Sequence, residues 1–208
     1  MTSPIRHTPR KQPRQARSQQ MVDTLLDAAV RVLGERGLEA TTTNEIARVA
    51  GVSVGSLYQY FPSKEAMLAA ALDRKFTRGI ERVFEVPAPD GGSFAEQMRD
   101  GLRAAIDLYR GDLEFFRAVL LHVPRVGRVE ALRAHVHAGR ERLRDALIAR
   151  SAELRPVDPE LAAFVIVSAI EWVILTCVLE QPERLSDPRL VEELIALVGG
   201  YLAPRPGP

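Results

Sequence analysis

The side chains that most often carry out catalysis do not stand at spacings that would let them act together. His135 and His137 are two residues apart, so on a helix they point to different faces, whereas a helical pair of metal ligands needs a spacing near four. The one cysteine, Cys177, has no histidine close to it in sequence that would activate its thiol. We therefore expect no enzymatic activity, no metal site and no cofactor.

Hydroxyl, amide and ammonium groups gather between residues 42 and 64, where two short helices are expected. Small, apolar and hydrogen-bonding residues form the outer face of the second short helix: Val54, Gly55, Ser56, Gln59 and Tyr60. Such a face can enter a DNA major groove, which is about 12 Å wide, because small residues let the helix approach the bases. Groups that suit phosphate oxygens surround this face: Thr42, Thr43, Tyr58, Tyr60 and Lys64. The chemistry indicated is recognition of double-stranded DNA.

The charge of the chain is divided unevenly. Residues 1–84 hold 13 Lys and Arg against 8 Asp and Glu, a balance of +5, while residues 85–208 hold 15 against 19, a balance of −4. The basic part is therefore the candidate for binding a polyanion. Residues 1–17 are interpreted as a flexible basic arm, since they contain five Lys and Arg, three Pro and no acidic residue. A solvated terminus without a partner is the alternative.

Helices must position these groups, because almost every long segment carries apolar residues at i, i+3, i+4 and i+7. The first stripe begins at Val22, and Gly37 is well placed to end its helix. Thr42 and Glu45 have the spacing of a capping box that opens a short helix, which ends at Gly51.

A second short helix follows, capped by Ser53 and stopped by Pro62, and Ser63 can cap a longer helix that continues towards Phe84. Two short helices separated by a turn that contains glycine form a helix-turn-helix. Its shared core is expected from these small and apolar residues: Ile46, Ala47, Ala50, Val52, Leu57 and Phe61.

The run TTTNEIARVAGVSVGSLYQYFPSKEAML, preceded by LDAAVRVLGERGLEA, resembles the N-terminal domain of the TetR family of bacterial regulators. The resemblance covers about residues 18–68, and its GVS, LYxYF and SKE elements lie in register with the helix pattern. It implies an all-α, Ω-shaped homodimer with a three-helix DNA-binding head and a larger C-terminal domain for ligand binding and dimerisation. It also implies that residues 54–60 form the recognition helix, with backbone contacts from Thr43, Tyr58, Tyr60 and Lys64.

We accordingly expect three parts: the basic arm over 1–17, the DNA-binding domain with its connecting helix over 18–84, and the ligand-binding and dimerisation domain over 85–208. A run rich in Pro and Gly over 86–93 is expected to join the last two. Three helical stripes follow it, with Pro124 and Gly127 between the second and the third.

In the TetR family the helices of the C-terminal domain enclose a cavity. Large apolar and aromatic residues are therefore candidate walls for an apolar or aromatic ligand: Phe94, Met98, Tyr109, Phe115, Phe116, Leu120 and Trp172. Plain core packing is the alternative for each of them.

The most apolar segment of the chain is 161–179, whose 19 residues approach the length of a membrane span. Glu171 sits at its middle, and a charge at that depth is costly in lipid, so we expect no membrane partner. A helix apolar all round must instead be covered by protein, and one side can be a second subunit. The stripe over 191–202 would complete the four-helix dimer interface that is typical of the family.

Glu171 and Cys177 are the odd residues of this segment. The carboxylate of Glu171 could meet a cationic group of a ligand or pair with an arginine such as Arg117 or Arg133, and we favour the structural pairing. Cys177 is expected to be an inert, buried thiol. A single cysteine, and the lack of an apolar run in the first twenty residues, indicate the reducing cytoplasm.

Together these features predict a ligand-responsive transcriptional repressor that binds a palindromic operator as a homodimer. A small molecule that tilts the heads would change the spacing of the two recognition helices and release the DNA. Two alternatives stay open: a dimeric or structural DNA-binding protein without a small-molecule ligand, and an activator.

Overall fold

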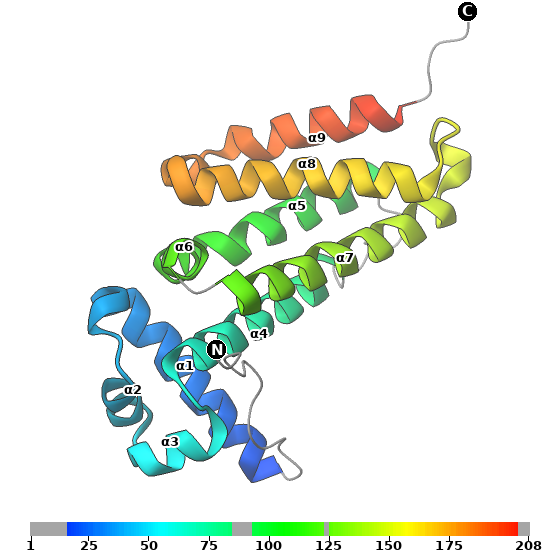
Figure 1. The fold of residues 1–208 in the computed structure, drawn as a ribbon. Coiled ribbons are helices and arrows are strands. Elements are labelled where there is room, and N and C mark those ends of the chain that lie inside the picture. The colour runs from blue at the N-terminus through cyan, green and yellow to red at the C-terminus, as the bar shows by residue number, and fades with distance from the viewer. Residues whose placement is uncertain (1–15, 85–92, 123–124, 204–208) are drawn as a thin grey trace, which may run out of the picture. The chain divides into compact units, whose positions relative to one another are not determined.

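The computed structural model describes residues 16–84, 93–122 and 125–203, and the regular structure in these ranges is helical throughout (Figure 1). The predicted all-α fold is therefore confirmed. Its α-helices are α1 (Ala16–Ala40), α2 (Thr43–Ala50), α3 (Val54–Tyr60), α4 (Lys64–Phe84), α5 (Phe94–Arg110), α6 (Leu113–His122), α7 (Arg125–Ala149), α8 (Pro159–Glu180) and α9 (Pro188–Leu202). The predicted basic arm, except for its last two residues, and the predicted connection up to residue 92 lie outside the described residues.

The described residues form two compact units. The first, called the head unit, contains the residues up to Phe76 together with Asp112–Leu132; the second, called the body unit, contains Thr77–Gly111 and the residues from Arg133 onwards. One boundary lies between α5 and α6, and the other two fall inside α4 and inside α7, so α4 and α7 each contribute to both units. The domain boundary expected at residue 84 stays a prediction, and the compact units divide eight residues earlier.

The core of the head unit is built from α1, α2, α3, α6 and the first part of α4. The positions Ile46, Leu57 and Phe61, expected as core from the sequence, are fully buried. Phe116 of α6 packs against Phe76 of α4 in the same unit, with ring centroids 5.8 Å apart. Helix α6 therefore packs with the N-terminal helices, although it follows α5 in the chain.

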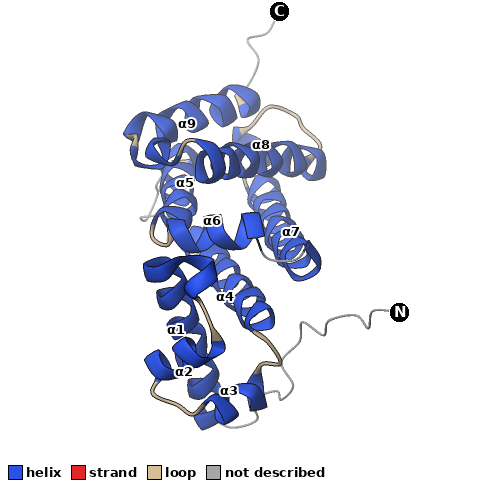
Figure 2. Cartoon of the chain, turned by 60° about the vertical axis from the view of Figure 1, so that its left-hand side comes forward, coloured by secondary structure: helices blue, strands red, loops and turns tan. Residues whose placement is uncertain are grey.

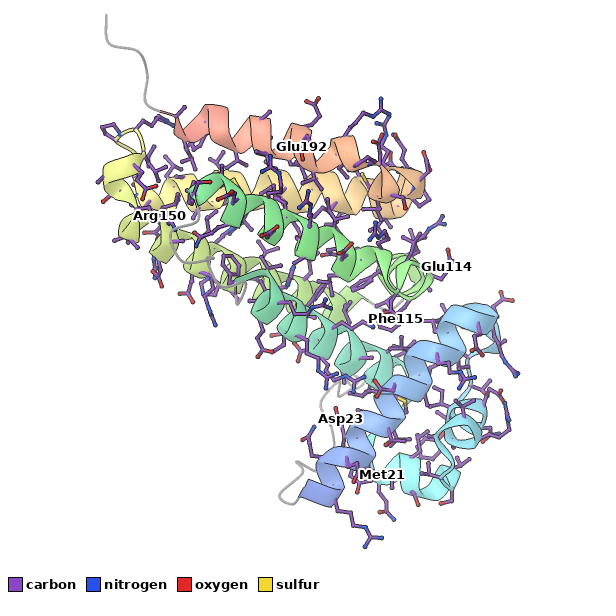
Figure 3. All side chains as sticks on the ribbon, turned by 180° about the vertical axis from the view of Figure 1, so that it is seen from behind. Met21, Asp23, Glu114, Phe115, Arg150 and Glu192 are labelled. Atoms are coloured by element: carbon purple, nitrogen blue, oxygen red, sulfur yellow. The ribbon has the colours of Figure 1, made fainter. Side chains whose placement is uncertain are left out.

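Helix α1 is interrupted where the sequence predicts its end. Gly37 has a φ of 74° and a ψ of 173°, a combination open to almost no residue but glycine. The Thr41 hydroxyl donates to the Gly37 carbonyl over 2.7 Å and so closes the turn that leads to α2. Towards the start of α1, the Arg74 guanidinium of α4 donates to Asp23 over 2.9 Å (Figure 3 labels Asp23). This bond fixes α4 against α1.

The body unit places α5, α8, α9 and the second part of α7 around one apolar cluster. Buried residues from three helices meet in it: Leu147, Ala162, Ala163, Ile166, Val198 and Leu202. In both views α8 and α9 run alongside each other (Figures 1 and 2). Arg99 of α5 pairs with Glu192 of α9 over 3.1 Å, so α5 is tied to the same pair of helices.

Side-chain caps define where the helices of the body unit begin. Ser93 and Glu96 form a reciprocal capping box at the start of α5. Asp158 and Asp187 accept backbone N–H groups at the starts of α8 and α9, and a proline follows each of them at the first helical position. Proline suits that position because the N–H that it lacks would have no partner inside the helix.

The structure corrects one expected helix boundary. Helix α6 is described up to His122 and α7 from Arg125, and Pro124 lies outside the described residues. Gly127, which was expected to help separate the two helices, lies inside α7.

Among the described helices, α8 is long and apolar enough to cross a membrane, judged by length and composition alone. Ala162, Ile166, Ile174 and Val178 are nevertheless buried within the body unit. The carboxylate of Glu171 lies near the middle of the same helix and accepts a hydrogen bond from another helix. One side of α8 therefore packs in the core of the body unit, and a charged group at the middle of a helix is costly at bilayer depth.

Candidate nucleic-acid interface and internal cavity

The two short helices of the head unit begin and end as their sequence predicts. The Glu45 backbone N–H donates to the Thr42 hydroxyl over 3.2 Å, which caps α2. Gly51 ends α2 with a φ of 70°, and its N–H donates back to the Arg48 carbonyl. The Ser53 hydroxyl then accepts from the Ser56 N–H over 3.0 Å and opens α3. A turn of three residues therefore joins two capped helices.

Glu45 departs from the predicted capping box. Its carboxylate pairs with Arg48 over 2.6 Å and with Arg36 over 2.9 Å rather than completing the box at Thr42. The hydrogen bond from Arg48, reinforced by the charge of Arg36, holds the pKa of Glu45 below its usual value. The pair with Arg36 joins α1 to α2, so Glu45 helps to fix the first helix of the motif.

The segment from Gly51 to Gly55 has the spacing of the Gly-x-Ser-x-Gly elbow of hydrolases, although no such elbow is expected in this chain. An elbow requires a strand before the serine and a helix after it, so that the hydroxyl stands exposed as a nucleophile. Here helix α2 precedes Ser53, and the hydroxyl caps α3 and lies 2.8 Å from the Ser56 hydroxyl. Ser53 is a capping residue in this structure.

The outer face of α3 is small and accessible. Gly55 and Gln59 are exposed, and Val54, Ser56 and Tyr60 are half-buried. Leu57 on the opposite face is fully buried. The face is therefore held rigidly from behind, while the groups predicted to meet DNA point away from the core.

Hydroxyl groups border this face on two helices. The Thr43 hydroxyl of α2 lies 3.1 Å from the Tyr58 hydroxyl of α3, and Tyr58 is 43% exposed. Thr42 is also exposed at the start of α2. The structure thus brings three of the predicted phosphate contacts together along one edge of the motif.

Lys64 has a role that sequence reasoning missed. Its ammonium donates to the Leu38 carbonyl over 3.2 Å, just after the break of α1 at Gly37. One of its three N–H groups is therefore used to join α4 to α1, and a phosphate contact by the others stays a prediction.

The body unit contains a cavity of about 250 Å³. Four of the residues predicted as ligand walls line it: Phe94, Met98, Tyr109 and Glu171. The second part of α4 supplies Ile80, Val83 and Phe84, and α7 supplies Gly139 and Leu143. Most of the wall is aliphatic or aromatic.

The other four predicted wall residues lie elsewhere. Phe115 and Phe116 are buried in the head unit, and Leu120 is a half-buried residue of the same helix α6 (Figure 3 labels Phe115). Trp172 is 72% exposed on α8. A helical stripe shows which face of a helix is apolar but not which unit that face packs in, and this explains the misplacement of the α6 residues.

Glu171 is paired with groups other than the arginines expected from the sequence. The Tyr109 hydroxyl donates to Glu171 Oε1, and His135 Nε2 lies 3.6 Å from Oε2. Arg117 instead lies 3.7 Å from Glu114 of its own helix. Burial, and then the nearby carboxylate, raise the pKa of Tyr109 well above its usual value. The phenol therefore stays a neutral donor.

His135 was considered only as half of a metal pair with His137, and its place in the cavity was missed. His137 is exposed, whereas the side chain of His135 is 8% exposed and lines the cavity. The i, i+4 spacing of His135 with Gly139 and Leu143 along the apolar face of α7 is the signal that could have found it. The described residues contain no cluster of three metal-ligating side chains.

Cys177 is buried on α8, 4% exposed. Burial raises the pKa of its thiol, which keeps the group in its unreactive protonated form. The structure thus gives Cys177 the environment of a core residue.

The described residues thus form helices, with a capped helix-turn-helix in one unit and a mainly apolar cavity in the other. The sequence profile of bacterial regulatory proteins of the tetR family matches residues 25–71. The profile of the tetracyclin repressor-like C-terminal domain matches residues 93–202, more than half of the chain. The chain belongs to the TetR family of bacterial transcriptional regulators.

Individual relatives match mainly the head. The nucleoid occlusion factor SlmA of Haemophilus ducreyi is 38% identical over 74 residues, which are 36% of this chain and 35% of SlmA. The transcriptional repressor KstR of Mycolicibacterium smegmatis is 44% identical over 54 residues, 26% of each chain. The chain thus spans between about a quarter and a third of the length of these curated relatives.

Similarity to solved structures extends over most of the chain. The transcriptional regulator FadR of Bacillus subtilis, solved in complex with stearoyl-CoA, has a TM-score of 0.63 at 24% identity, covering 85% of this chain and 96% of FadR. At that identity the likeness establishes the shared fold.

Proposed function

We propose that the protein is a transcriptional repressor that binds a palindromic operator as a homodimer and leaves it when a small molecule enters the body unit. The observation that carries the proposal is the outer face of α3, which is small, accessible and backed by a buried core. The similar protein KstR is named a transcriptional repressor, which supports repression as the direction of regulation. Activation of transcription is the alternative.

The outer face of α3 suits a major groove. Gly55 leaves its centre without a side chain, and Gln59 offers an amide that can donate to and accept from a base edge. The border of hydroxyl groups formed by Thr42, Thr43 and Tyr58 suits phosphate oxygens, which position a protein on DNA without reading its sequence. Base reading is therefore assigned to Val54, Gly55, Ser56 and Gln59.

An exposed apolar stripe on α8 supports a homodimer. Leu161, Phe164 and Trp172 are 58%, 49% and 72% exposed, and their spacing of three, eight and eleven residues keeps them on neighbouring positions of one helical side. Leu197 of α9 is 55% exposed as well. Large apolar side chains that gather in this way mark an interaction surface. A two-fold dimer would present two α3 helices to half-sites about 34 Å apart.

The cavity supports a small-molecule effector. FadR, which shares the fold, was solved with stearoyl-CoA bound. In this chain α4 contributes Ile80, Val83 and Phe84 to the cavity wall and begins at Lys64 in the head unit. A ligand that changes the packing of those three residues acts on a helix shared with the head, which is the coupling that an effector needs.

The proposed function is tested by selecting, from fragmented genomic DNA, the pieces that the purified protein binds. We expect a motif with two-fold symmetry whose half-sites are about one helical turn apart. Adding small apolar compounds to the complex should release the DNA. Enrichment of no motif, or of a motif without symmetry, would contradict a dimeric operator-binding repressor.

A further inference from the structure

Three polar side chains meet at one end of the cavity, while the rest of its wall is apolar except for Gln97. Tyr109 of α5, His135 of α7 and Glu171 of α8 converge there. Tyr109 is 1% exposed, and the side chains of His135 and Glu171 are 8% and 13% exposed. These groups come from three helices, so they form a built site inside the body unit.

The carboxylate of Glu171 is held in a defined orientation. Tyr109 donates to Oε1, and His135 Nε2 lies on the side of Oε2 at 3.6 Å. A carboxylate has about four acceptor positions on its two oxygens, and these two neighbours can occupy no more than two of them. Acceptor capacity is left on a carboxylate that lines a cavity.

The charge of the cavity wall restricts what can enter. Its described lining residues include one carboxylate, Glu171, and one imidazole, His135, but neither lysine nor arginine. Whether the imidazole is protonated or neutral, these groups sum to zero or to −1, never to a positive value. Among the described lining residues, only His135 could carry a positive charge, and it lies beside Glu171. A ligand with an anionic head would therefore bring a second negative charge next to a carboxylate, which is unfavourable.

A ligand with a cationic head would instead interact favourably with the same wall. It would gain an ion pair with Glu171 in a space of low polarity, where opposite charges attract far more strongly than in water. The aliphatic and aromatic wall would cover the rest of the molecule. The volume of about 250 Å³ exceeds the roughly 150 Å³ that accepts benzene and lies below the range of about 300–1,000 Å³ that drug-sized ligands occupy.

We infer that the effector is a small lipophilic amine, with an apolar body of about one ring and a short chain and a single protonated amino group that binds the carboxylate of Glu171. The inference rests on the proposed function, because it takes the cavity to be the effector site. It distinguishes this chain from FadR, whose structure contains an acyl-CoA.

The inference is tested by calorimetric titration of the full chain, without DNA, with three molecules of one shape: 4-butylbenzylamine, 4-butylbenzyl alcohol and 4-butylbenzoate. We expect the amine to bind at least about tenfold more tightly than the alcohol, and the carboxylate to bind most weakly. Equal affinities for amine and alcohol, tightest binding by the carboxylate, or no binding by any of the three would overturn the inference.

The variant Glu171→Gln tests the residue. It keeps an oxygen that can accept from Tyr109 and removes the charge, so the preference for the amine over the alcohol should fall below about threefold while the affinity for the alcohol stays within threefold. Glu193→Gln, an exposed carboxylate of α9, is the matched control and should keep the preference. Equal weakening of both ligands by Glu171→Gln would show a purely structural carboxylate. The comparison of the three ligands on the unmodified chain holds even if this variant does not fold.

Failure of the inference and failure of the proposed function give different results. If the amine binds but does not release operator DNA, the ligand class is right and release by an effector is wrong. If another compound releases the DNA while the amine does not bind, the repressor mechanism stands and the ligand class is wrong.

Discussion

Gly55 is the residue of α3 whose side chain would come between the helix and a DNA base. A Cβ at this position would meet only the Ser53 hydroxyl, at 3.8 Å, so the fold has room for it. Gly55→Ala should therefore leave the free energy of unfolding unchanged or raise it by up to about 1 kcal/mol. The same methyl group should weaken operator binding at least about fivefold, since the helix can no longer approach the bases as closely. Denaturant unfolding and fluorescence anisotropy with labelled DNA measure the two effects, and unchanged DNA affinity would remove Gly55 from the reading face.

Lys64 is predicted to act on the DNA backbone, in contrast to the residues that read bases. Lys64→Met should weaken specific and random DNA alike and reduce the slope of log affinity against log salt by about 0.9, the value for one phosphate contact. Val54→Ala and Ser56→Ala should change base preference and leave that slope as it is. Because Lys64 also donates to the Leu38 carbonyl, the thermal unfolding of the variant must be compared first. An unchanged slope in a folded variant would leave Lys64 with its structural role alone.

At the scale of elements, Gly51 and Gly34 form a matched pair of glycines. Gly51 has a φ of 70° at the end of α2, where any other L-residue is strained, so Gly51→Ala should lower the free energy of unfolding by about 1–2 kcal/mol. Gly34 is exposed within α1 with open space around it, and Gly34→Ala should raise the free energy of unfolding by about 0.5–1 kcal/mol. Urea denaturation of both variants checks the signs, and a Gly51→Ala variant at least as stable as the parent chain would argue against the turn described for Gly51.

Asp187 makes the start of α9 sensitive to acid. It accepts the Arg189 backbone N–H over 2.9 Å and pairs with the Arg189 guanidinium over 2.7 Å. The side-chain hydrogen bond, then the backbone bond, lower the pKa of Asp187 to about 2. A lowered pKa stabilises the folded chain fully above the unfolded value of about 4, and this contribution is lost as the pH falls towards 2. Melting curves of the parent and Asp187→Asn should therefore differ at pH 6 and converge near pH 2. A constant difference across that range would contradict the linkage.

Local signals in the sequence predicted the elements well, because the residues that end or open a helix act on their own neighbours. Gly51, Thr42 and Ser53 fix the motif through contacts within a few residues, and the motif could be located from them. The cavity depends on which helices meet across the chain, and periodicity does not contain that information. Phe116 and Trp172 were misplaced for this reason. The spacing of His135 from His137 argues against a helical metal pair, but it does not show that His135 lies on the apolar face of α7.

At the scale of the whole molecule, the exposed stripe on α8 predicts the oligomeric state. Trp172→Glu places a charge in the proposed interface, where it would be desolvated without a partner. The variant should sediment as a monomer. Its operator affinity should fall by at least about a hundredfold, because a monomer binds only one half-site. Ile148→Glu on α7, an apolar residue exposed to 54%, is the control and should stay dimeric. A dimeric Trp172→Glu variant would place the interface elsewhere.

The number of residues in helix α4 sets the angle about the helix axis between its first and last residues, as well as the length of the helix. One uninterrupted helix carries both the head residues that follow Lys64 and the cavity residues Ile80, Val83 and Phe84. Each residue turns an α-helix by about 100°, so a single residue inserted after Thr77 would rotate the buried face of the first part away from that of the second. Two full turns, about seven residues, would nearly restore the phase but would lengthen the helix by about 10 Å. We therefore expect natural relatives to vary in their loops while α4 keeps its residue count between the two units.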